Sequence, residues 1–180
     1  MPCIIRAIDA SEATRLLPVF SDLLVDAIAH GASVNFMAGL TPAQAAAYWQ
    51  KQIAGLAEGD RIWLVAEDAA AIIGMVMCLF PWQPNQVFRG EVSKMIVHSS
   101  RRKQGIGALL MQAIEAGALE AGKTHLLLDT ATGDSGERLY RRMGWTEVGI
   151  LPRFAYHPDG RLADATVFFK ELAPPPPPPR

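Results

Sequence analysis

Three features are scarce in this 180-residue sequence: cysteine, long apolar runs and an excess of charge of one sign. Cys3 and Cys78 are too few for a disulfide framework and have no metal-ligand spacing around them, so we expect neither a disulfide scaffold nor a metal site. The longest apolar stretch, from Ala69 to Phe80, is too short to cross a bilayer. The segment after Met1 has an early charge and no long apolar core, unlike a secretory signal. These absences predict a cytoplasmic protein from a reducing compartment, without a membrane partner.

The charge balance is close to zero, because 17 lysines and arginines face 18 aspartates and glutamates. A general nucleic-acid binder needs a basic excess to neutralise phosphates, so the sequence predicts no nucleic-acid partner. Half of the residues are hydrophobic, which is enough for one packed core. Thirteen prolines are present, but six form a single run from Pro174 to Pro179. We therefore expect one folded domain over residues 1–172 and a disordered, proline-rich tail over 173–180.

The hydrophobic pattern predicts alternating strands and helices in one α/β domain. Apolar residues at helical spacing after Ser11 indicate a first helix that His30-Gly31 ends, and Thr41-Pro42 marks the start of a second. The expected strands cover residues 3–8, 61–67, 70–80, 88–97, 126–129, 146–151 and 165–172, and the expected helices cover 11–30, 41–58, 105–121 and 135–143. The resulting order, βααβββαβαββ, indicates a mixed central sheet of about six to seven strands flanked by helices.

The segment from Val97 to Gly107 combines a strand end, a basic turn and the start of a helix. Its Arg102-x-x-Gly105-x-Gly107 pattern presents backbone N–H groups at a helix N-terminus, where the partial positive charge suits a pyrophosphate. From Arg89 to Gly107 there are five basic residues and one acidic residue, which favours a polyanionic ligand. The loop is not a Walker motif, because G-K-[ST] is missing, and no G-x-G-x-x-G supports a Rossmann loop.

This loop and a second motif, Leu139-Tyr-Arg-Arg-Met-Gly-Trp145, together resemble the GNAT N-acetyltransferase superfamily. In that superfamily the first motif holds the coenzyme A pyrophosphate and the second carries a tyrosine near the thioester sulfur. The sequence is most similar to the tabtoxin-resistance acetyltransferase group, which acetylates the amino group of a small β-lactam amino-acid toxin. The segments that resemble this group are His30–Leu40, Val65–Asp68, Glu91–Met95, Leu128–Thr130, Pro158–Leu162 and Phe168–Lys170. The sequence departs from the pattern at Asn35, where glycine is expected, and at Gly133, where many GNAT proteins have asparagine.

The resemblance implies acetyl-CoA as the cosubstrate and no metal. It also implies that the backbone N–H of Val97 donates to the oxyanion that forms during acetyl transfer. The residues expected to bind acetyl-CoA are Met95, Ile96, Val97, Arg102, Lys103, Gln104, Gly105, Ile106 and Gly107.

Acetyl transfer to an amine needs a base for the ammonium proton and an acid for the departing thiolate. The resemblance makes Tyr140 the candidate acid, since a phenol with a pKa of about 10 can protonate a thiolate whose thiol has a pKa of about 8.5. Glu91 and Asp129 are the candidate bases, acting through water. Asp129 ends an apolar strand, at the edge where ligands of α/β sheets collect.

Each of these catalytic assignments has a structural alternative. Tyr140 could be a core residue, and either carboxylate could serve only a hydrogen bond or salt bridge. In the expected strand over residues 88–97, alternation places four side chains on one face: Glu91, Ser93, Met95 and Val97. We expect that face to meet acetyl-CoA, although a β-bulge would reverse the alternation.

The loop after the first expected helix supplies the acceptor-binding candidates, which are His30, Ser33, Asn35 and Phe36. His30 could instead close the helix, because it precedes a glycine that suits the helix end. Neither cysteine has a motif partner that would activate it, so direct transfer is expected rather than an acyl-enzyme.

The sequence therefore predicts an enzyme that moves an acetyl group from acetyl-CoA to a primary amine of a small molecule, such as an amino-acid-like or β-lactam toxin. Two alternatives stay open: a GNAT enzyme that acetylates a protein N-terminus or lysine, and a non-catalytic acyl-CoA-binding module. Dimerisation is common in the superfamily, which makes a homodimer a further expectation that no residue of the sequence tests.

Overall fold

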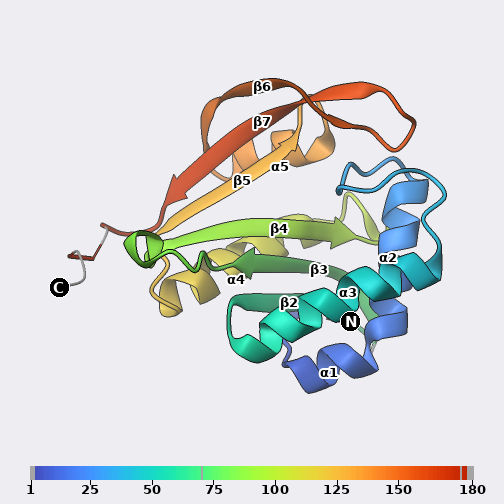
Figure 1. Ribbon diagram of the computed structural model, residues 1–180, viewed down its shortest axis with the longest axis horizontal. Helices are drawn as coiled ribbons and strands as arrows, with labels where there is room; N and C mark the ends of the chain where they lie inside the picture. The colour runs from blue at the N-terminus through green and yellow to red at the C-terminus, as the bar shows by residue number, and fades with distance from the viewer. Residues whose placement is uncertain (1–2, 70, 175, 178–180) are drawn as a thin grey trace.

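The computed structural model describes residues 3–69, 71–174 and 176–177, and it contains a seven-stranded sheet in the order β1-β2-β3-β4-β5-β7-β6 (Figure 1). The strands are β1 (Ile4–Ala7), β2 (Arg61–Asp68), β3 (Ala71–Leu79), β4 (Arg89–Val97), β5 (His125–Ala131), β6 (Thr146–Tyr156) and β7 (Leu162–Glu171). The helices are α1 (Ala10–Arg15), α2 (Leu17–Ala29), α3 (Pro42–Glu58), α4 (Ile106–Glu120) and α5 (Ser135–Arg142). The expected α/β class with a mixed sheet is confirmed, because β4 and β5 pair in parallel and the other neighbouring strands pair antiparallel.

The first expected helix is two helices in the structure, α1 and α2, which meet at Leu16. Pro18 lies in the first turn of α2 and has no N–H to donate to the carbonyl of Thr14, so the hydrogen bonds of α1 do not continue through it. The helix start also differs from expectation, because α1 begins at Ala10 rather than at Ser11. Asp9 caps it, with its Oδ1 accepting from a first-turn N–H at 2.7 Å. The order of elements is therefore βαααβββαβαββ.

The second expected helix begins where the sequence predicts. Thr41 and Gln44 form a capping box at the start of α3: the Gln44 N–H donates to Thr41 Oγ1 at 3.3 Å, and the Thr41 N–H donates to Gln44 Oε1 at 3.0 Å. Gly59 ends α3 with a φ of 76°, the left-handed conformation that glycine adopts at the lowest cost.

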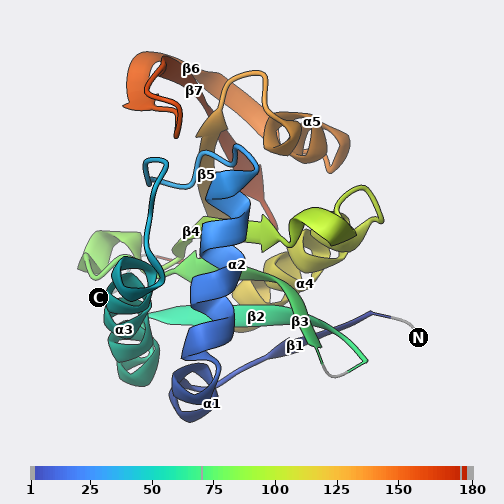
Figure 2. The same ribbon diagram turned by 90° about the vertical axis from the view of Figure 1, so that its right-hand side faces the viewer.

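The two faces of the sheet carry separate hydrophobic cores, and helices lie over both faces (Figure 2). α1, α2 and α3 cover one face, where the buried rings of Phe20, Trp49 and Trp63 have centroids 4.7 to 6.1 Å apart. α4 covers the other face, where Leu110 and Leu126 are buried. Burial of these apolar surfaces is the main force that holds the layers together. We name the two sides the α2/α3 face and the α4 face.

β4 and β5 lie side by side only near their beginnings. Their parallel pairing joins residues 89–91 of β4 to residues 125–127 of β5, and beyond Glu91 the two strands diverge (Figure 1). β5 remains paired with β7 over its whole length. The split opens the middle of the sheet and connects its two faces there.

A β-bulge interrupts β4 at Lys94. On β3, Met75 and Met77 are two residues apart, but their partners on β4, Ile96 and Ser93, are three residues apart. Lys94 has a φ of 52°, a conformation that a residue with a Cβ rarely adopts. The bulge accommodates this extra residue and turns the rest of the strand.

The bulge overturns the expected alternation along β4. Val92 packs in the core of the α4 face, whereas Ile96, four residues later, packs in the core of the α2/α3 face. Met95 and Val97 pack against the core of the α4 face. Glu91 neighbours Val92 in a regular part of the strand and therefore lies on the α2/α3 face. The expectation that Glu91 shares a face with Met95 and Val97 is wrong.

Two expectations concern the whole chain. No helix in the described ranges is long and apolar enough to cross a bilayer. Residues 175 and 178–180 of the expected tail lie outside those ranges, so the boundary between domain and tail stays a prediction.

Candidate active site

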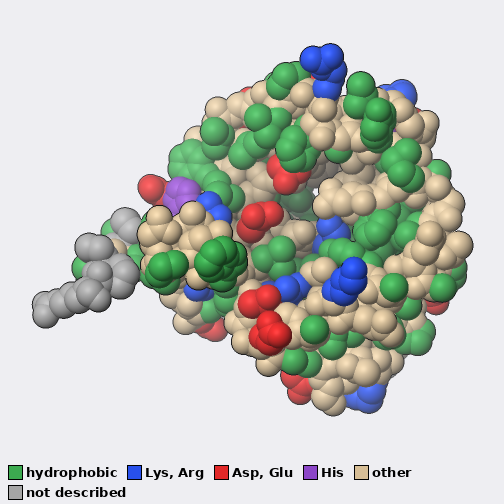
Figure 3. Space-filling model, viewed as in Figure 1, with side chains coloured by type: hydrophobic (Ala, Val, Ile, Leu, Met, Phe, Trp, Pro, Cys, Tyr) green, Lys and Arg blue, Asp and Glu red, His purple; other side chains and the backbone are tan. Residues whose placement is uncertain are grey.

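A cavity of about 630 Å³ opens where β4 and β5 part. Figure 3 shows this hollow in the middle of the molecule, with acidic and basic side chains around it. Its wall is built from β4, the first turn of α4, the end of β5, α5, the loop after α2 and parts of β6 and β7. The split therefore brings both sequence motifs to one site.

The N-terminus of α4 opens into this cavity. Gly105 is its N-cap, with a φ of 82°, and no side chain of the described residues caps the helix, so N–H groups of the first turn remain for an anion. A Cβ on Gly107 would lie 3.2 Å from Leu139 Cδ2 and 3.6 Å from Met95 Sδ, so a larger residue would crowd the wall. This arrangement suits a pyrophosphate held close to the backbone.

Eight of the nine residues expected to bind acetyl-CoA line the cavity. They are Met95, Ile96, Val97, Arg102, Lys103, Gly105, Ile106 and Gly107. Gln104 lies outside the lining, and its Nε2 donates to the Ser100 carbonyl at 3.5 Å.

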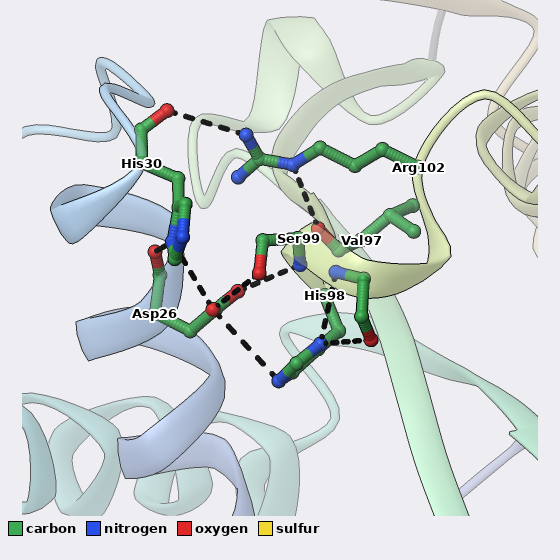
Figure 4. Close-up of polar contacts among 7 residues, drawn as sticks. Asp26, His30, Val97, His98, Ser99 and Arg102 are labelled. Carbon is green, nitrogen blue, oxygen red and sulfur yellow. Dashed lines mark hydrogen bonds and ion pairs between the residues drawn. The ribbon is translucent and has the colours of Figure 1, made fainter.

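Part of the positive charge of this loop is used within the protein. Arg101 forms an ion pair with Asp68 at the end of β2. Arg102 donates from Nε to the Val97 carbonyl at 3.2 Å and from Nη1 to the His30 carbonyl at 3.3 Å (Figure 4). Arg102 thus bridges the end of β4 to the end of α2, across one side of the cavity.

Asp26 fastens α2 to the turn that leads into α4 (Figure 4). Its carboxylate accepts from the Ser99 N–H at 2.8 Å and from Ser99 Oγ at 2.7 Å. His30 Nδ1 lies 3.2 Å from Asp26 Oδ1, and His98 Nε2 lies 3.8 Å from the same oxygen. Burial would raise the pKa of Asp26, but the hydrogen bonds from Ser99 outweigh it and hold the pKa below its ordinary value.

The backbone N–H of Val97 points into the split. The His98 N–H donates to the Ile73 carbonyl at 2.9 Å, so these two residues form a hydrogen-bonded pair of the antiparallel ladder. The next pair, Val97 with Gly74, is then a non-hydrogen-bonded pair, whose N–H and C=O groups point away from the partner strand. Since β5 has diverged on that side, the Val97 N–H can reach a ligand in the cavity.

Tyr140 of α5 is buried in the core of the α4 face and also lines the cavity. Its ring centroid lies 6.1 Å from those of Trp145 and Phe168. A Cβ on Gly136 would come within 3.3 Å of Tyr140 Cε2, so glycine makes room for the ring. Burial, aided by the charge of Asp129, raises the pKa of Tyr140 far above its ordinary value, so the hydroxyl keeps its proton at neutral pH.

Asp129 and Glu91 line the same cavity from the α2/α3 face. Leu126 and Leu128 of β5 are buried in the core of the α4 face, so alternation directs Asp129 to the opposite face. Burial raises the pKa of Asp129, while the charge of Lys94 lowers it by a smaller amount. Within the described ranges neither carboxylate has an ion-pair partner within 4.0 Å, so the salt bridge considered from the sequence is not found there.

Three of the four acceptor-binding candidates, His30, Ser33 and Asn35, line the cavity. Phe36 does not line it and meets the Tyr48 ring edge-on, with centroids 5.1 Å apart. Asn35 has a φ of 72°, a left-handed conformation that asparagine tolerates, and this accounts for its place where glycine is expected.

The loop that holds these candidates is attached to the opposite side of the cavity. The Ala38 N–H donates to the Pro158 carbonyl, in the turn between β6 and β7, at 3.0 Å. His30 is also the C-cap of α2, as the alternative interpretation of the sequence predicts, and its Nδ1 lies 2.8 Å from the Asp26 carbonyl.

Sequence reasoning missed two polar residues of this region, Lys94 and Asp26. The signal for Lys94 is its position between Val92 and Ile96, where period-two alternation predicts an apolar side chain. No pattern separates Asp26 from Asp22 of the same helix, because its partner Ser99 is distant in the sequence.

Residues 58–147 (90 of the 180 residues) match the model of the acetyltransferase (GNAT) domain family. The chain belongs to this family. The matched region includes β4, the loop before α4 and the Tyr140 motif, which are the parts that carried the resemblance in the sequence. The narrower resemblance to the tabtoxin-resistance group stays a prediction.

Individual relatives agree with this membership. An IAA acetyltransferase from Azospirillum brasilense is 32% identical over 105 residues, which are 58% of this chain and 65%, less than two thirds, of that relative. Among solved structures, an N-acetyltransferase from Staphylococcus aureus has a TM-score of 0.77 at 18% identity, covering 96% of this chain and 100% of that one. The yncA structure from Salmonella typhimurium, determined with its cofactor acetyl-CoA, has a TM-score of 0.77 at 19% identity and covers 99% of both chains. At these identities the structural likeness concerns the fold.

Proposed function

We propose that this GNAT protein transfers an acetyl group from acetyl-CoA directly to the primary amine of a small, amino-acid-like molecule. The observation that supports this most strongly is the placement of proton-handling groups on both sides of one split in the sheet. Tyr140 approaches the cavity from the α4 face, and Glu91 and Asp129 approach it from the α2/α3 face. A cosubstrate bound along the α4 face would meet an acceptor bound on the other face at the split.

Each residue has a defined task in this proposal. Acetyl-CoA, when bound, supplies an acetyl group activated as a thioester. The first turn of α4 at Gly105 would hold its pyrophosphate, and the Val97 N–H would donate to the acetyl carbonyl oxygen. Asp129 would take a proton from the acceptor ammonium, directly or through water, and its raised pKa makes it a stronger base than an aspartate with the ordinary pKa. The free amine would attack the acetyl carbonyl carbon and form the new C–N bond. As the C–S bond breaks, Tyr140 would donate its hydroxyl proton to the departing sulfur, and the second proton lost by the amine nitrogen would return to Tyr140 through water.

The surroundings of the carboxylates favour a small acceptor. The hydrogen bond from the Ala38 N–H to the Pro158 carbonyl joins the acceptor loop, whose Asn35 lines the cavity, to the β6–β7 turn. A loop held in this way leaves less room for a large acceptor. The resemblance to the tabtoxin-resistance group favours a toxin-like amino acid and a role in detoxification. The Azospirillum relative is named an IAA acetyltransferase, which supports acetyl transfer as the reaction.

A thiol-release assay with acetyl-CoA tests the proposal. The panel consists of free amino acids, β-lactam amino acids, polyamines, and peptides with free N-termini or lysines. We expect acetyl-dependent release of coenzyme A with at least one amino-acid-like amine. Activity confined to peptides would replace the small-molecule proposal with protein acetylation, and no release from any amine, with acetyl-CoA still bound, would indicate an acyl-CoA-binding module.

A further inference from the structure

Lys94 is a buried cation in the wall of the cavity. The residue is only 8% exposed, yet it lines the same cavity as the carboxylates Glu91 and Asp129. The β-bulge, in which Lys94 has a φ of 52°, places the residue in this wall. Without the extra residue of the bulge, the alternation of side chains along β4 would continue unbroken. A left-handed, non-glycine residue costs stability, and such strain is concentrated at functional sites.

The side chain of Lys94 points toward the acceptor side of the split. Its Nζ lies 5.5 Å from the centroid of the Tyr48 ring, and Tyr48 belongs to α3 and contacts Phe36 of the acceptor loop. Within the described ranges Nζ has no hydrogen bond and no ion pair within 4.0 Å. The charges of Asp129 and Glu91 act on it from a greater distance.

An ammonium in this position lacks a direct anionic partner. A buried charge is costly unless it is paired and hydrogen-bonded, and the ring of Tyr48 compensates only part of that cost. Burial lowers the pKa of Lys94, and the two carboxylates oppose that shift. A ligand that carried an anionic group to Nζ would remove the penalty.

We propose that Lys94 binds the carboxylate of the acceptor, so that the acceptors are amino acids rather than simple amines. This inference rests on the proposed function and narrows its substrate class. In this arrangement the acceptor carboxylate pairs with Lys94, and the acceptor ammonium faces Asp129 and Glu91. The two acidic side chains and one lysine then match the opposite charges of a zwitterion. An amine without a carboxylate leaves Lys94 unpaired.

The test compares each amino acid with its own α-carboxamide, which keeps the amine and the side chain and removes the negative charge. The full chain is assayed by thiol release with acetyl-CoA, and kcat/KM is measured for both members of each pair. We expect the wild type to favour the acid by about 10- to 100-fold, the range of a hydrogen bond to a charged group. Lys94→Met should reduce that preference to less than about threefold, mainly through KM, while the carboxamide changes little.

Two further variants separate charge recognition from a general loss of structure. Lys94→Arg keeps the cation and should retain part of the preference. Lys51→Met removes an exposed lysine of α3 and should behave as the wild type. The rise in the thermal unfolding temperature that acetyl-CoA causes shows whether each variant is folded.

The outcomes separate the two proposals. A wild type that acetylates acids and carboxamides equally well overturns the role of Lys94 and leaves the acetyltransferase proposal standing, even if Lys94→Met does not fold. If Lys94→Met keeps the preference for the acid over the carboxamide, the proposed role of Lys94 is also overturned, because its contact with Tyr48 is then the only role left for the side chain. A wild type that acetylates no amine overturns the proposed function and this inference with it.

Discussion

Asp26 offers a quantitative test of how the site is held together. Asp26→Ala removes the carboxylate that accepts two hydrogen bonds from Ser99, at 2.8 and 2.7 Å. His30 and His98 lose the same carboxylate as a neighbour. A hydrogen bond to a charged group contributes about 1.5–3 kcal/mol, and two that share one carboxylate do not add fully. The Asp26 side chain is only 15% exposed, so water replaces these bonds incompletely. We therefore expect the free energy of unfolding to fall by about 2–4 kcal/mol.

Urea unfolding of the wild type, Asp26→Ala and Asp22→Ala measures this loss. Asp22 is an exposed residue one helical turn earlier in α2, and it serves as the matched control with an expected change within about 0.5 kcal/mol. Ser99→Ala removes only the hydroxyl donor and should cost less than Asp26→Ala. A loss below about 1 kcal/mol for Asp26→Ala, or an equal loss for Asp22→Ala, would refute the interpretation of Asp26 as a structural tie.

The dependence of stability on pH tests the direction of the pKa shift of Asp26. Because the folded pKa of Asp26 is lower than its ordinary value of 3.8, the ionised carboxylate stabilises the fold fully well above pH 3.8. That contribution is lost as the pH falls through the lowered folded value. The stability difference between wild type and Asp26→Ala should therefore shrink in acid. A difference that stays constant down to the lowest pH at which both proteins remain folded would contradict the assignment.

Three other predictions address packing and chemistry. Gly117→Ala in α4 should raise the free energy of unfolding by about 0.5–1 kcal/mol, because the new Cβ meets nothing closer than Ile62 Cδ1 at 3.7 Å and alanine is the better helix former. Gly74→Ala should lower it by about 1–3 kcal/mol, since its Cβ would lie 2.9 Å from the Ile96 carbonyl oxygen; urea unfolding measures both. In a pH profile of kcat/KM, wild-type activity should fall in acid as Asp129 takes up a proton, and the fall should begin above the ordinary aspartate pKa of 3.8 because the pKa of Asp129 is raised. Asp129→Asn should lose both activity and this acidic limb of the profile. An unchanged limb in the variant would exclude Asp129 as the base.

Local signals in the sequence predicted most of the secondary structure. The capping box at Thr41 and Gln44 and the glycine at the end of α3 act through neighbouring residues, so a short window contains them. The division of the first helix also had a local cause in Pro18, but the apolar spacing on both sides of it suggested one continuous helix.

The geometry of the site depended on contacts that no local window contains. The bulge at Lys94 is defined by how β4 pairs with Met75 and Met77 of β3, and it places Met95 and Val97 on the opposite face from Glu91. The role of Asp26 depends on Ser99, 73 residues away in the sequence. Motif resemblance located Tyr140 and the Gly105–Gly107 loop, and it also named Glu91 and Asp129, which line the same cavity. Only the tertiary structure showed the positions of Lys94 and Asp26.

The most direct test of the central claim is a comparison of Tyr140→Phe with the wild type in both acetyl-CoA binding and thiol release. The variant removes one hydroxyl from a ring that remains packed between Trp145 and Phe168, and Tyr156→Phe, on an exposed tyrosine of β6, is the matched control. We predict that Tyr140→Phe binds acetyl-CoA normally but loses at least about 100-fold in turnover, the contribution of a general acid. Turnover equal to that of the wild type and Tyr156→Phe would contradict the account.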